Sequence, residues 1–239
     1  MKILKESGNY LRNQTLKNLA KAIACLLLVS GIGLFLFVKL VTSSVGILEE
    51  ALAVFALFLL GTFFIYLRKY HVYLGGWNGE KRVVEILRTS LGNDYFLINN
   101  VRFRDGQGDI DHIVLGPNGI FSIETKNWRG KITCNGDSWQ RKDRPLVASS
   151  PSEQAKKNAF RVRHAIEKNK KISFNSWIEP ILVFTNKHAE LYLNNPTVAV
   201  LKLQQLPGYI TTYEIHSGAY SYSRQQLEQI GKEIAKQTH

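Results

Sequence analysis

Residues 108–131 of the chain read Gly-Asp-Ile-Asp-His-Ile-Val-Leu-Gly-Pro-Asn-Gly-Ile-Phe-Ser-Ile-Glu-Thr-Lys-Asn-Trp-Arg-Gly-Lys. Two runs rich in β-branched residues, 110–115 and 120–125, flank the turn-forming residues 116–119, and this pattern predicts a β-hairpin. Both runs are apolar almost throughout, as in strands of a sheet that is covered on both faces. The charged residues of the stretch gather at the strand ends, where the two strands meet the same edge of the sheet.

The register of this hairpin decides whether its acids lie together. Alternation places Glu124 and Lys126 on one face. An even-numbered loop would place Leu115 opposite Ile120. Counting back, Asp111 would then lie opposite Glu124, with Cβ atoms about 4.5–5.5 Å apart, and two carboxylates so close repel unless a cation or a proton lies between them. A three-residue loop would put them on opposite faces. The residues alone allow both loops. The metal-site hypothesis below needs Asp111, Glu124 and Lys126 on one face, so we expect the even loop.

An acid, a second acid about a dozen residues later and then x-Lys form the D…(D/E)xK arrangement of a large nuclease superfamily, which this hairpin resembles. More narrowly, the run from Asp111 to Ile132 resembles the nuclease-related domain family (NERD). The resemblance extends more loosely from about Gly79 to about Phe184 and does not cover the first seventy residues. It implies an α/β fold of the restriction-endonuclease-like type, a mixed sheet flanked by helices.

The charged residues of the hairpin suit metal-dependent phosphodiester hydrolysis. Asp111 and Glu124 offer hard oxygen ligands for Mg²⁺ or Mn²⁺, and the carbonyl group of Thr125 could add another. Such an ion polarises a phosphoryl oxygen and lowers the pKa of a bound water, while Lys126 stabilises developing charge or positions the nucleophile. No covalent intermediate is needed.

A further candidate acid precedes the hairpin in the chain. We expect a linker over residues 71–77, then a helix that begins at Asn78 or Gly79 and ends near Leu91. Glu80 falls on the apolar stripe of this helix, so its carboxylate should point inward. The residues alone also allow a first-turn acid that the helix dipole stabilises. The family resemblance implies an acid that approaches the metal site.

A second helix follows the hairpin. Residues 150–153, Ser-Pro-Ser-Glu, form a capping box with proline at the first helical position, which is a strong helix start. The resemblance implies that Gln154 orients the Lys126 end of the site. A polar and cationic face of this helix could contact a phosphate backbone, although a solvated charged face is the alternative. The residues expected to contact nucleic acid are Lys157, Arg161, Arg141, Lys142 and Arg144.

The rest of the downstream chain predicts further strands and one helix. We expect strands over residues 95–103, 131–135, 178–185 and 198–203, a turn over 136–139, and a terminal helix over 223–237 that Ser223 caps. The expected order is helix, three strands, helix, strand. The sequence contains no His/Cys metal cluster, Walker loop, GxSxG motif or repeat.

The first seventy residues have a different composition. Two apolar segments, about 22–41 and 48–67, are each long enough to cross a hydrocarbon core of about 30 Å as a helix. Residues 42–46 form a short turn between them, so we expect a transmembrane helical hairpin. A cleaved signal peptide and a buried soluble hairpin are the alternatives, and no Ala-x-Ala site follows the first segment.

Charge predicts the orientation of this hairpin. Five basic residues precede the first segment and Arg68 and Lys69 follow the second, whereas the turn is followed by Glu49 and Glu50. The positive-inside rule therefore places both termini, and the domain after the hairpin, in the cytoplasm, with the chain as a multi-pass protein of the cytoplasmic membrane. We expect a membrane anchor over residues 1–70 and a nuclease-related domain over residues 71–239.

Net charge adds a preference for polyanionic partners. Of the +12 total, +5 falls in residues 1–70 and +7 in residues 71–239, which suits nucleic acid or anionic lipid, although a solvated cationic surface explains charge equally well. Only Cys25 and Cys134 occur, and no disulfide between them is expected.

The sequence thus predicts a membrane-anchored, Mg²⁺- or Mn²⁺-dependent nuclease acting in the cytoplasm, with DNA as the favoured substrate. The alternative is a catalytically inactive nucleic-acid-binding or membrane-assembly module on the same fold.

Overall fold

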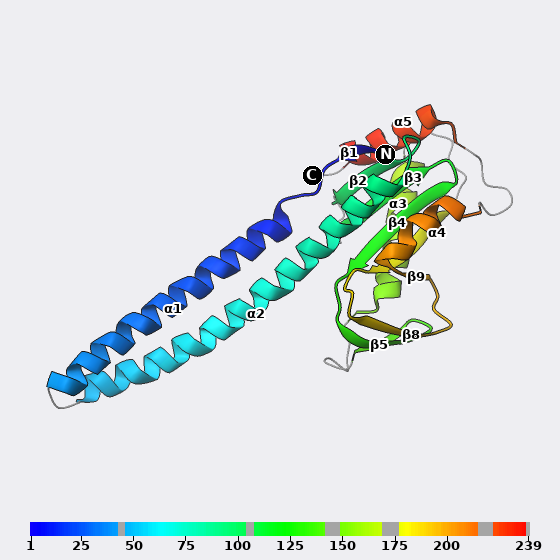
Figure 1. The fold of residues 1–239 in the computed structure, drawn as a ribbon. Helices are drawn as coiled ribbons and strands as arrows, with labels where there is room; N and C mark the ends of the chain where they lie inside the picture. Colours follow the sequence, from blue (N-terminus) through cyan, green and yellow to red (C-terminus); the bar gives the residue numbers. More distant parts are fainter. Residues whose placement is uncertain (43–45, 104–107, 142–148, 169–176, 215–221, 238–239) are drawn as a thin grey trace. The chain divides into compact units, whose positions relative to one another are not determined.

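The computed structural model of the chain describes residues 1–42, 46–103, 108–141, 149–168, 177–214 and 222–237. The chain divides into two compact units, which are described separately (Figure 1). One unit comprises Asn9–Trp77. The other comprises Met1–Gly8 together with Asn78–His239. The sequence placed a boundary at residue 70, so the first eight residues are an unexpected part of the larger unit.

The smaller unit is a pair of antiparallel helices. Helix α1 spans Tyr10–Thr42, and helix α2 begins at Ile47 and continues into the larger unit. The ammonium group of Lys21 lies 5.3 Å from the centre of the Tyr66 ring. Toward the turn, Lys39 Nζ lies 3.9 Å from the carboxylate of Glu49. These two contacts, one within the helices and one beside the turn, define the helical hairpin that the sequence predicts.

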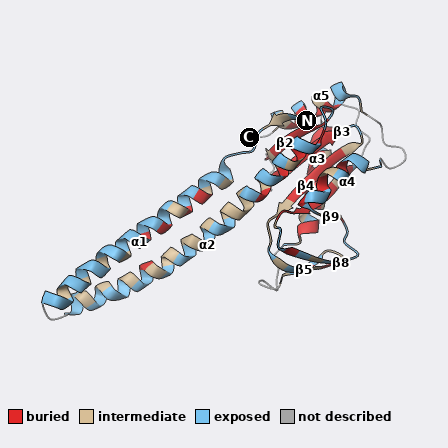
Figure 2. Cartoon of the chain, viewed as in Figure 1, coloured by how far each residue is buried: buried red, intermediate tan, exposed pale blue. Residues whose placement is uncertain are grey.

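The surface of this hairpin is apolar. Large side chains such as Leu27, Leu40 and Phe58 are each more than 60% exposed, and Figure 2 shows most of both helices as exposed. Exposed apolar surface on this scale is uncommon on soluble monomers and marks a protein or membrane contact. Both helices are long and apolar enough to cross a membrane, and the expected spans 22–41 and 48–67 lie within them.

Helix α2 is longer than the sequence indicated. It spans Ile47–Ser90 without interruption, so the expected linker over residues 71–77 and the expected helix start at Asn78 or Gly79 are wrong. The segment contains the glycine pair at residues 75 and 76 but no proline. A glycine costs a helix only about 1 kcal/mol relative to alanine, whereas proline costs about 3 kcal/mol. The strong helix-forming residues on either side of the pair therefore keep the helix continuous.

A mixed six-stranded sheet forms the centre of the larger unit. The strands lie in the order β1-β2-β3-β4-β7-β9. Strands β2, β3 and β4 are antiparallel neighbours, while β1 is parallel to β2, and β7 is parallel to both β4 and β9. Their bounds are Lys2–Lys5, Phe96–Val101, Ile110–Gly116, Gly119–Lys126, Ile178–Phe184 and Ala199–Lys202.

The hairpin between β3 and β4 has the even loop. Leu115 pairs with Ile120 and Gly116 with Gly119, which leaves Pro117 and Asn118 as the loop residues. Asn118 fixes this turn, because its side-chain oxygen accepts a hydrogen bond from the Tyr95 hydroxyl at 2.9 Å while its amide nitrogen donates to the backbone of α4. A Cβ atom at Gly116 would lie 2.3 Å from the Tyr95 ring, so only glycine fits there.

Helices cover both faces of the sheet. Helices α3 (Pro151–Glu167) and α5 (Arg224–Lys236) pack on one face, with apolar residues such as Val162 and Ile230 in the core. The last turns of α2 and the short helix α4 (Leu206–Thr212) pack on the other face, around Val83 and Phe121. Both expected caps are present, since Ser150 accepts from Glu153 N–H and Ser223 from Gln226 N–H. Figure 2 shows the resulting core as buried strands.

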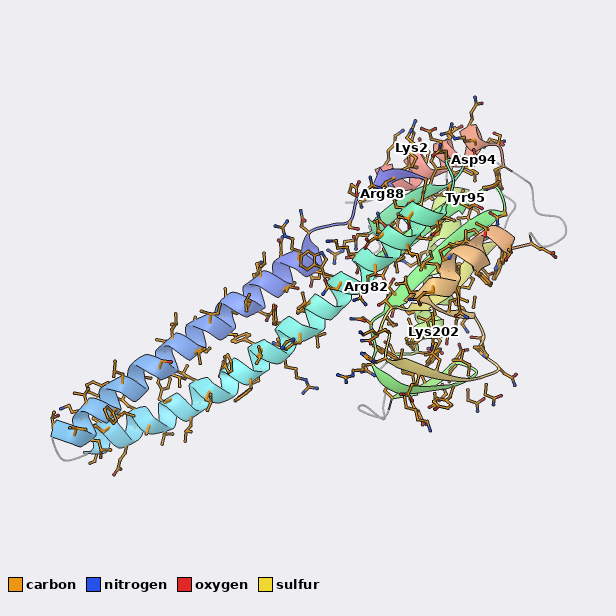
Figure 3. The ribbon with its side chains drawn as sticks, in the orientation of Figure 1. Lys2, Arg82, Arg88, Asp94, Tyr95 and Lys202 are labelled. Atoms are coloured by element: carbon orange, nitrogen blue, oxygen red, sulfur yellow. The ribbon has the colours of Figure 1, made fainter. Side chains whose placement is uncertain are left out.

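Two features of the larger unit were not expected from the sequence. Strand β1 is four residues long and has no readable periodicity, yet the Lys2 N–H donates to the Tyr95 carbonyl at 2.9 Å and begins a parallel ladder with β2; both residues are labelled in Figure 3. A second sheet has the order β6-β5-β8, with bounds Ser138–Arg141, Gly130–Asn135 and Ala189–Asn194. The expected turn over residues 136–139 is therefore shorter, since Ser138 and Trp139 belong to β6.

Gly79 allows a close approach of α2 to the end of the sheet, and this predicts a destabilising substitution. A Cβ atom at Gly79 would lie 2.9 Å from Thr185 Oγ1 and 3.4 Å from the Asn127 Cβ atom. We expect Gly79→Ala to lower the melting temperature in detergent by several degrees, because overpacking costs about 1–3 kcal/mol and exceeds a helix-propensity gain of about 1 kcal/mol. Gly208→Ala in α4 is the matched control, since it meets nothing within 4 Å and should be neutral or stabilising. Equal melting temperatures for the two variants would contradict the close packing.

Candidate active site

The candidate site lies at the edge of the sheet where β3 begins and β4 ends. Because these strands are antiparallel, the start of β3 and the end of β4 meet at one edge, which brings Asp111 beside Glu124 and Lys126. Glu80 comes from α2, and Gln154 comes from the first turn of α3. The five residues that the sequence named as catalytic are thus drawn from four elements of one unit.

Glu124 and Lys126 form the centre of a hydrogen-bond network. Lys126 Nζ lies 2.6 Å from Glu124 Oε1 and donates to Gln154 Oε1 at 3.0 Å. The second carboxylate oxygen of Glu124 accepts from Asn158 Nδ2 at 3.0 Å. Glu124 is only 3% exposed, so its charge depends on these two partners in place of water. Gln154 and Asn158 are one helical turn apart on α3, which places both amides over the end of β4.

Asp111 is tied to the backbone of β4. Its Oδ2 atom accepts a hydrogen bond from the Thr125 N–H at 2.7 Å. The N–H and C=O groups of a strand residue point to the same side of the strand. The carbonyl group of Thr125 therefore faces the β3 side, where Asp111 lies, as the proposed ligand set requires.

Glu80 reaches the same region from α2. Its Oε2 atom accepts from Asn100 Nδ2 at 3.0 Å. Burial raises the pKa of Glu80 to about 7; the hydrogen bond from Asn100 opposes this rise, and the negative charge of Glu124 adds to it. The sequence left open whether Glu80 is only a first-turn acid. That alternative is wrong, because α2 begins 33 residues earlier at Ile47 and Glu80 lies in its interior.

The carboxylates influence one another electrostatically. Burial, followed by the charges of Glu124 and Glu80, raises the pKa of Asp111 well above its usual value, and the Thr125 N–H and Lys126 oppose the rise. Burial also raises the pKa of Glu124, although the charge and hydrogen bond of Lys126 favour its ionised form. Lys126 thus opposes the rise in pKa of both Asp111 and Glu124. Raised pKa values that come from burial and like charges are typical of functional sites.

The donor atoms fit a hard divalent cation. In the described part of the chain, no three Asp, Glu, His or Cys side chains form a metal-ligand group. Asp111 and Glu124, with the carbonyl group of Thr125, make a smaller donor set of oxygen atoms only. Mg²⁺ is commonly held by one or two carboxylates and keeps several waters, so such a set suits Mg²⁺ or Mn²⁺. A cation there would also offset the repulsion between the buried Glu124 and the half-buried Asp111.

Arg161 does not lie where the sequence indicated. It was expected on an exposed cationic edge with Gln154 and Lys157, but it is only 7% exposed. Its guanidinium group donates to the Gly108 carbonyl at 3.1 Å and to Asn158 Oδ1 at 3.3 Å, and it lies over the ring of Phe103. Because Arg161 follows Asn158 by three residues, both side chains turn toward the sheet. Arg161 therefore fixes the amide that binds Glu124.

The other basic residues differ in their placement. Lys157 is exposed on α3. The guanidinium group of Arg141 lies 4.7 Å from the centre of the Trp128 ring. Trp128 itself follows Lys126 by two residues in the chain. Lys142 and Arg144 lie outside the described residues.

Sequence reasoning missed two asparagines of the site. Asn158 follows Gln154 by four residues in a helix that the sequence predicted, so the helical period was a signal that could have identified it. Asn100 follows Asn99 at the end of a strand, and its backbone has the left-handed φ of 46°. An Asn-Asn pair in an otherwise apolar strand was the available signal, because asparagine tolerates this conformation better than most residues.

A mixed sheet with an acid pair, a lysine and a helix-borne glutamine at one edge defines a restriction-endonuclease-like protein. Residues 75–185 match the family model of the nuclease-related domain, and that family belongs to the restriction-endonuclease-like superfamily. The fold class expected from the sequence is confirmed. The site residues Glu80, Asp111, Glu124, Lys126 and Gln154 all fall within the matched range.

A curated relative gives limited further information. The chain is 40% identical over 60 residues to an uncharacterized protein of Bacillus anthracis. The match covers 24% of this chain and 28% of that protein, so the chain spans well under a third of the relative's length. No solved structure matches the chain.

The pKa of Glu80 predicts a pH-dependent stability. The folded chain keeps a proton on Glu80 up to a pKa of about 7, while the unfolded chain releases it near the usual value of 4.5. Stability without metal should therefore fall as the pH rises between these values, by roughly 3 kcal/mol in total. Glu80→Gln removes this loss, so in EDTA its melting temperature should exceed that of the wild type at pH 8 by more than at pH 5.

The matched control for this measurement is Glu85→Gln. Glu85 is on the same helix but exposed, so its variant should follow the wild type across the whole pH range. Parallel curves for the wild type and Glu80→Gln would show that Glu80 is ionised normally in the folded chain.

Proposed function

We propose that this protein is a membrane-anchored nuclease that hydrolyses phosphodiester bonds of nucleic acid with Mg²⁺ or Mn²⁺ on the cytoplasmic side, with DNA as the first candidate substrate. The observation that carries the proposal is the convergence of Asp111, Glu124 and Lys126 at one edge of the sheet. Glu124 is buried and Asp111 is half-buried, both have raised pKa values, and Lys126 is the described cation that opposes the rise for each of them. A nuclease-related domain provides the framework for this site.

Each residue has a role that follows from its contacts. Asp111, Glu124 and the Thr125 carbonyl would hold the divalent ion, which when bound supplies a polarised phosphoryl oxygen and a more acidic water. Lys126 is held by Glu124 and Gln154 at 2.6 and 3.0 Å, so its ammonium group is oriented to stabilise negative charge that develops on the phosphate. The charge of Glu80 raises the pKa of Asp111, so Glu80 would add negative charge to the site, and we assign it the role of holding a water there.

Basic side chains around the site suit a phosphate backbone. Lys157 is exposed on the helix that carries Gln154, and Arg141 lies over Trp128 close to the end of β4. Contacts of this kind neutralise phosphates without reading bases, so binding should depend more on salt than on sequence. The +7 charge of residues 71–239 supports the same class of partner.

The topology of the proposal rests on the pairing of β1 with β2. Strand β1 precedes the apolar hairpin and β2 follows it, yet the two are hydrogen-bonded neighbours in one sheet. A membrane cannot divide a sheet, because the paired backbone groups must meet. This pairing supports a topology in which both ends of the hairpin lie on one side, and the basic residues before Ala22 and after Leu67 support the cytoplasm as that side.

A reporter fusion tests this topology. A reporter that is active only outside the cytoplasm should be inactive when it is fused after His239 and active when it is inserted between Thr42 and Gly46. The reason is that the turn crosses to the other side while both termini stay inside. Activity of the fusion at His239 would refute the cytoplasmic assignment, and inactivity of the insertion would refute the membrane crossing.

The purified full-length chain should cleave nucleic acid when Mg²⁺ or Mn²⁺ is present. Incubation with end-labelled DNA and RNA should show cleavage that EDTA abolishes. Lys126→Ala should lower the rate at least 100-fold, because a charge that stabilises the transition state is worth roughly 3 kcal/mol. Lys232→Ala is the matched control, since Lys232 pairs with Glu228 on the exposed side of α5, and its rate should be unchanged.

A binding measurement separates the nuclease from the non-catalytic alternative. A divalent ion should raise the melting temperature of the wild type by mass action, and Asp111→Asn should lose most of that gain. A chain that binds nucleic acid but shows neither cleavage nor ion-dependent stabilisation is a non-catalytic module, and the proposal fails.

A further inference from the structure

The first eight residues pack against the strand that supports Glu80. Besides its ladder with β2, this segment makes contacts through side chains and through its chain end. The terminal ammonium group donates to the Leu91 carbonyl at 3.1 Å, and Lys5 Nζ donates to the Asn100 carbonyl at 3.0 Å. The side chain of Asn99 donates in turn to the Lys5 carbonyl at 3.2 Å. The segment is therefore fastened at both of its ends.

Asn100 connects this segment to the candidate site. Its Oδ1 atom accepts a hydrogen bond from the Gly8 N–H at 2.7 Å, and its Nδ2 atom donates to Glu80 Oε2 at 3.0 Å. The two bonds together fix the orientation of the amide, because the end that accepts from Gly8 must be the oxygen. The nitrogen is then directed to the carboxylate of Glu80.

The backbone of Asn100 has adapted to this position. Its φ of 46° lies in the left-handed region that most side chains avoid. The Lys5 ammonium group binds the carbonyl of the same residue, so the amino-terminal segment contacts both the side chain and the backbone of Asn100. Residues held in such conformations by several contacts are concentrated at functional sites.

We propose that residues 1–8 complete the active site, with Asn100 as the positioning residue that transmits their contact to Glu80. The inference rests on the proposed function of the acid cluster. Residues on the amino-terminal side of the apolar hairpin and residues on its carboxyl-terminal side then form one site. A chain without the first eight residues lacks the Gly8 N–H that directs the Asn100 amide nitrogen toward Glu80. Partners that orient a site acid in this way typically contribute 10- to 100-fold in metal affinity or activity.

A designed disulfide tests the contact itself. A Cβ atom at Gly8 would lie 3.6 Å from the Asn100 Cβ atom, which is within the range of about 3.5–4.5 Å that a disulfide requires. The full-length pair Gly8→Cys and Asn100→Cys should therefore cross-link in membranes under mild oxidation, as linked peptides in a mass spectrum after digestion. The control pair is Gly92→Cys with Asn100→Cys, since a Cβ atom at Gly92 meets nothing within 4 Å. A cross-link in the control alone, or in neither pair, overturns the proposal.

Asn100→Gly tests the positioning role without straining the backbone. Glycine adopts a positive φ readily, so this variant removes only the amide. The matched control is Asn195→Gly, because Asn195 has the same φ of 46° but is exposed and outside the site. In full-length protein, Asn100→Gly should need 10- to 100-fold more Mg²⁺ or Mn²⁺ for the same rise in melting temperature, and its maximal cleavage rate should fall. Asn195→Gly should match the wild type in both.

The outcomes separate this inference from the proposed function. If the wild type responds to the ion and Asn100→Gly responds equally, the positioning role is refuted. If Asn100→Asp, which retains the shape but brings a carboxylate to Glu80, restores the ion response, the role is also refuted. If the wild type shows no ion response, the proposed function and the positioning role fail together, while the disulfide still decides whether the amino-terminal segment lies on Asn100.

Discussion

Two carboxylates that face each other at the end of a hairpin are the constraint on which the candidate site depends. Glu124 is buried and Asp111 is half-buried, the charge of Glu124 raises the pKa of Asp111, and Lys126 opposes the rise in pKa for both acids. Such an arrangement is unfavourable without compensation, because each charge loses water and gains a like-charged neighbour. The surrounding hydrogen bonds from Thr125 and Asn158 provide part of that compensation, and a hard divalent ion would provide more.

Helix α3 supplies further hydrogen bonds that stabilise the charged groups of the site. Gln154 in its first turn accepts a hydrogen bond from Lys126, and Asn158 in its second turn donates one to Glu124. Arg161 in the third turn donates to Asn158 and fixes its orientation. The position of the helix start is set by its own polar contacts, since Ser152 donates to Asp137 at 2.7 Å and accepts from the Trp139 indole at 3.0 Å. The turn between β5 and β6 thereby aligns the amides with the acids.

The pairing of β1 with β2 relates the site to the apolar hairpin. A strand from before the hairpin and a domain from after it fold as one unit, so this unit cannot fold completely until the chain between its two parts has been made and has turned back. Asn100 lies at the end of β2, where the amino-terminal segment and Glu80 meet. Folding of the domain and formation of the apolar hairpin are in this way coupled through ordinary backbone pairing.

Local pattern determined much of this protein from the sequence. The turn at residues 116–119, the cap at Ser150 and the two apolar segments each contain their own signal within a few residues, because turn chemistry, capping and hydrophobic length are local properties. The pattern of an acid pair followed by x-Lys similarly indicated the residues of the site. The even loop was chosen by the tertiary structure, through the contacts of Asn118 with Tyr95 and α4.

The tertiary structure also decided the features that depend on distant partners. Strand β1 is too short to show a period and forms because β2 offers an unpaired edge. Arg161 turned inward because Gly108 and Asn158 provide acceptors that no helical pattern reveals. The unbroken α2 shows the limit of local signals, since the linker expected over residues 71–77 is helical in the structure. Burial and pairing energies come from residues far apart in the chain, so they cannot be read from any one segment.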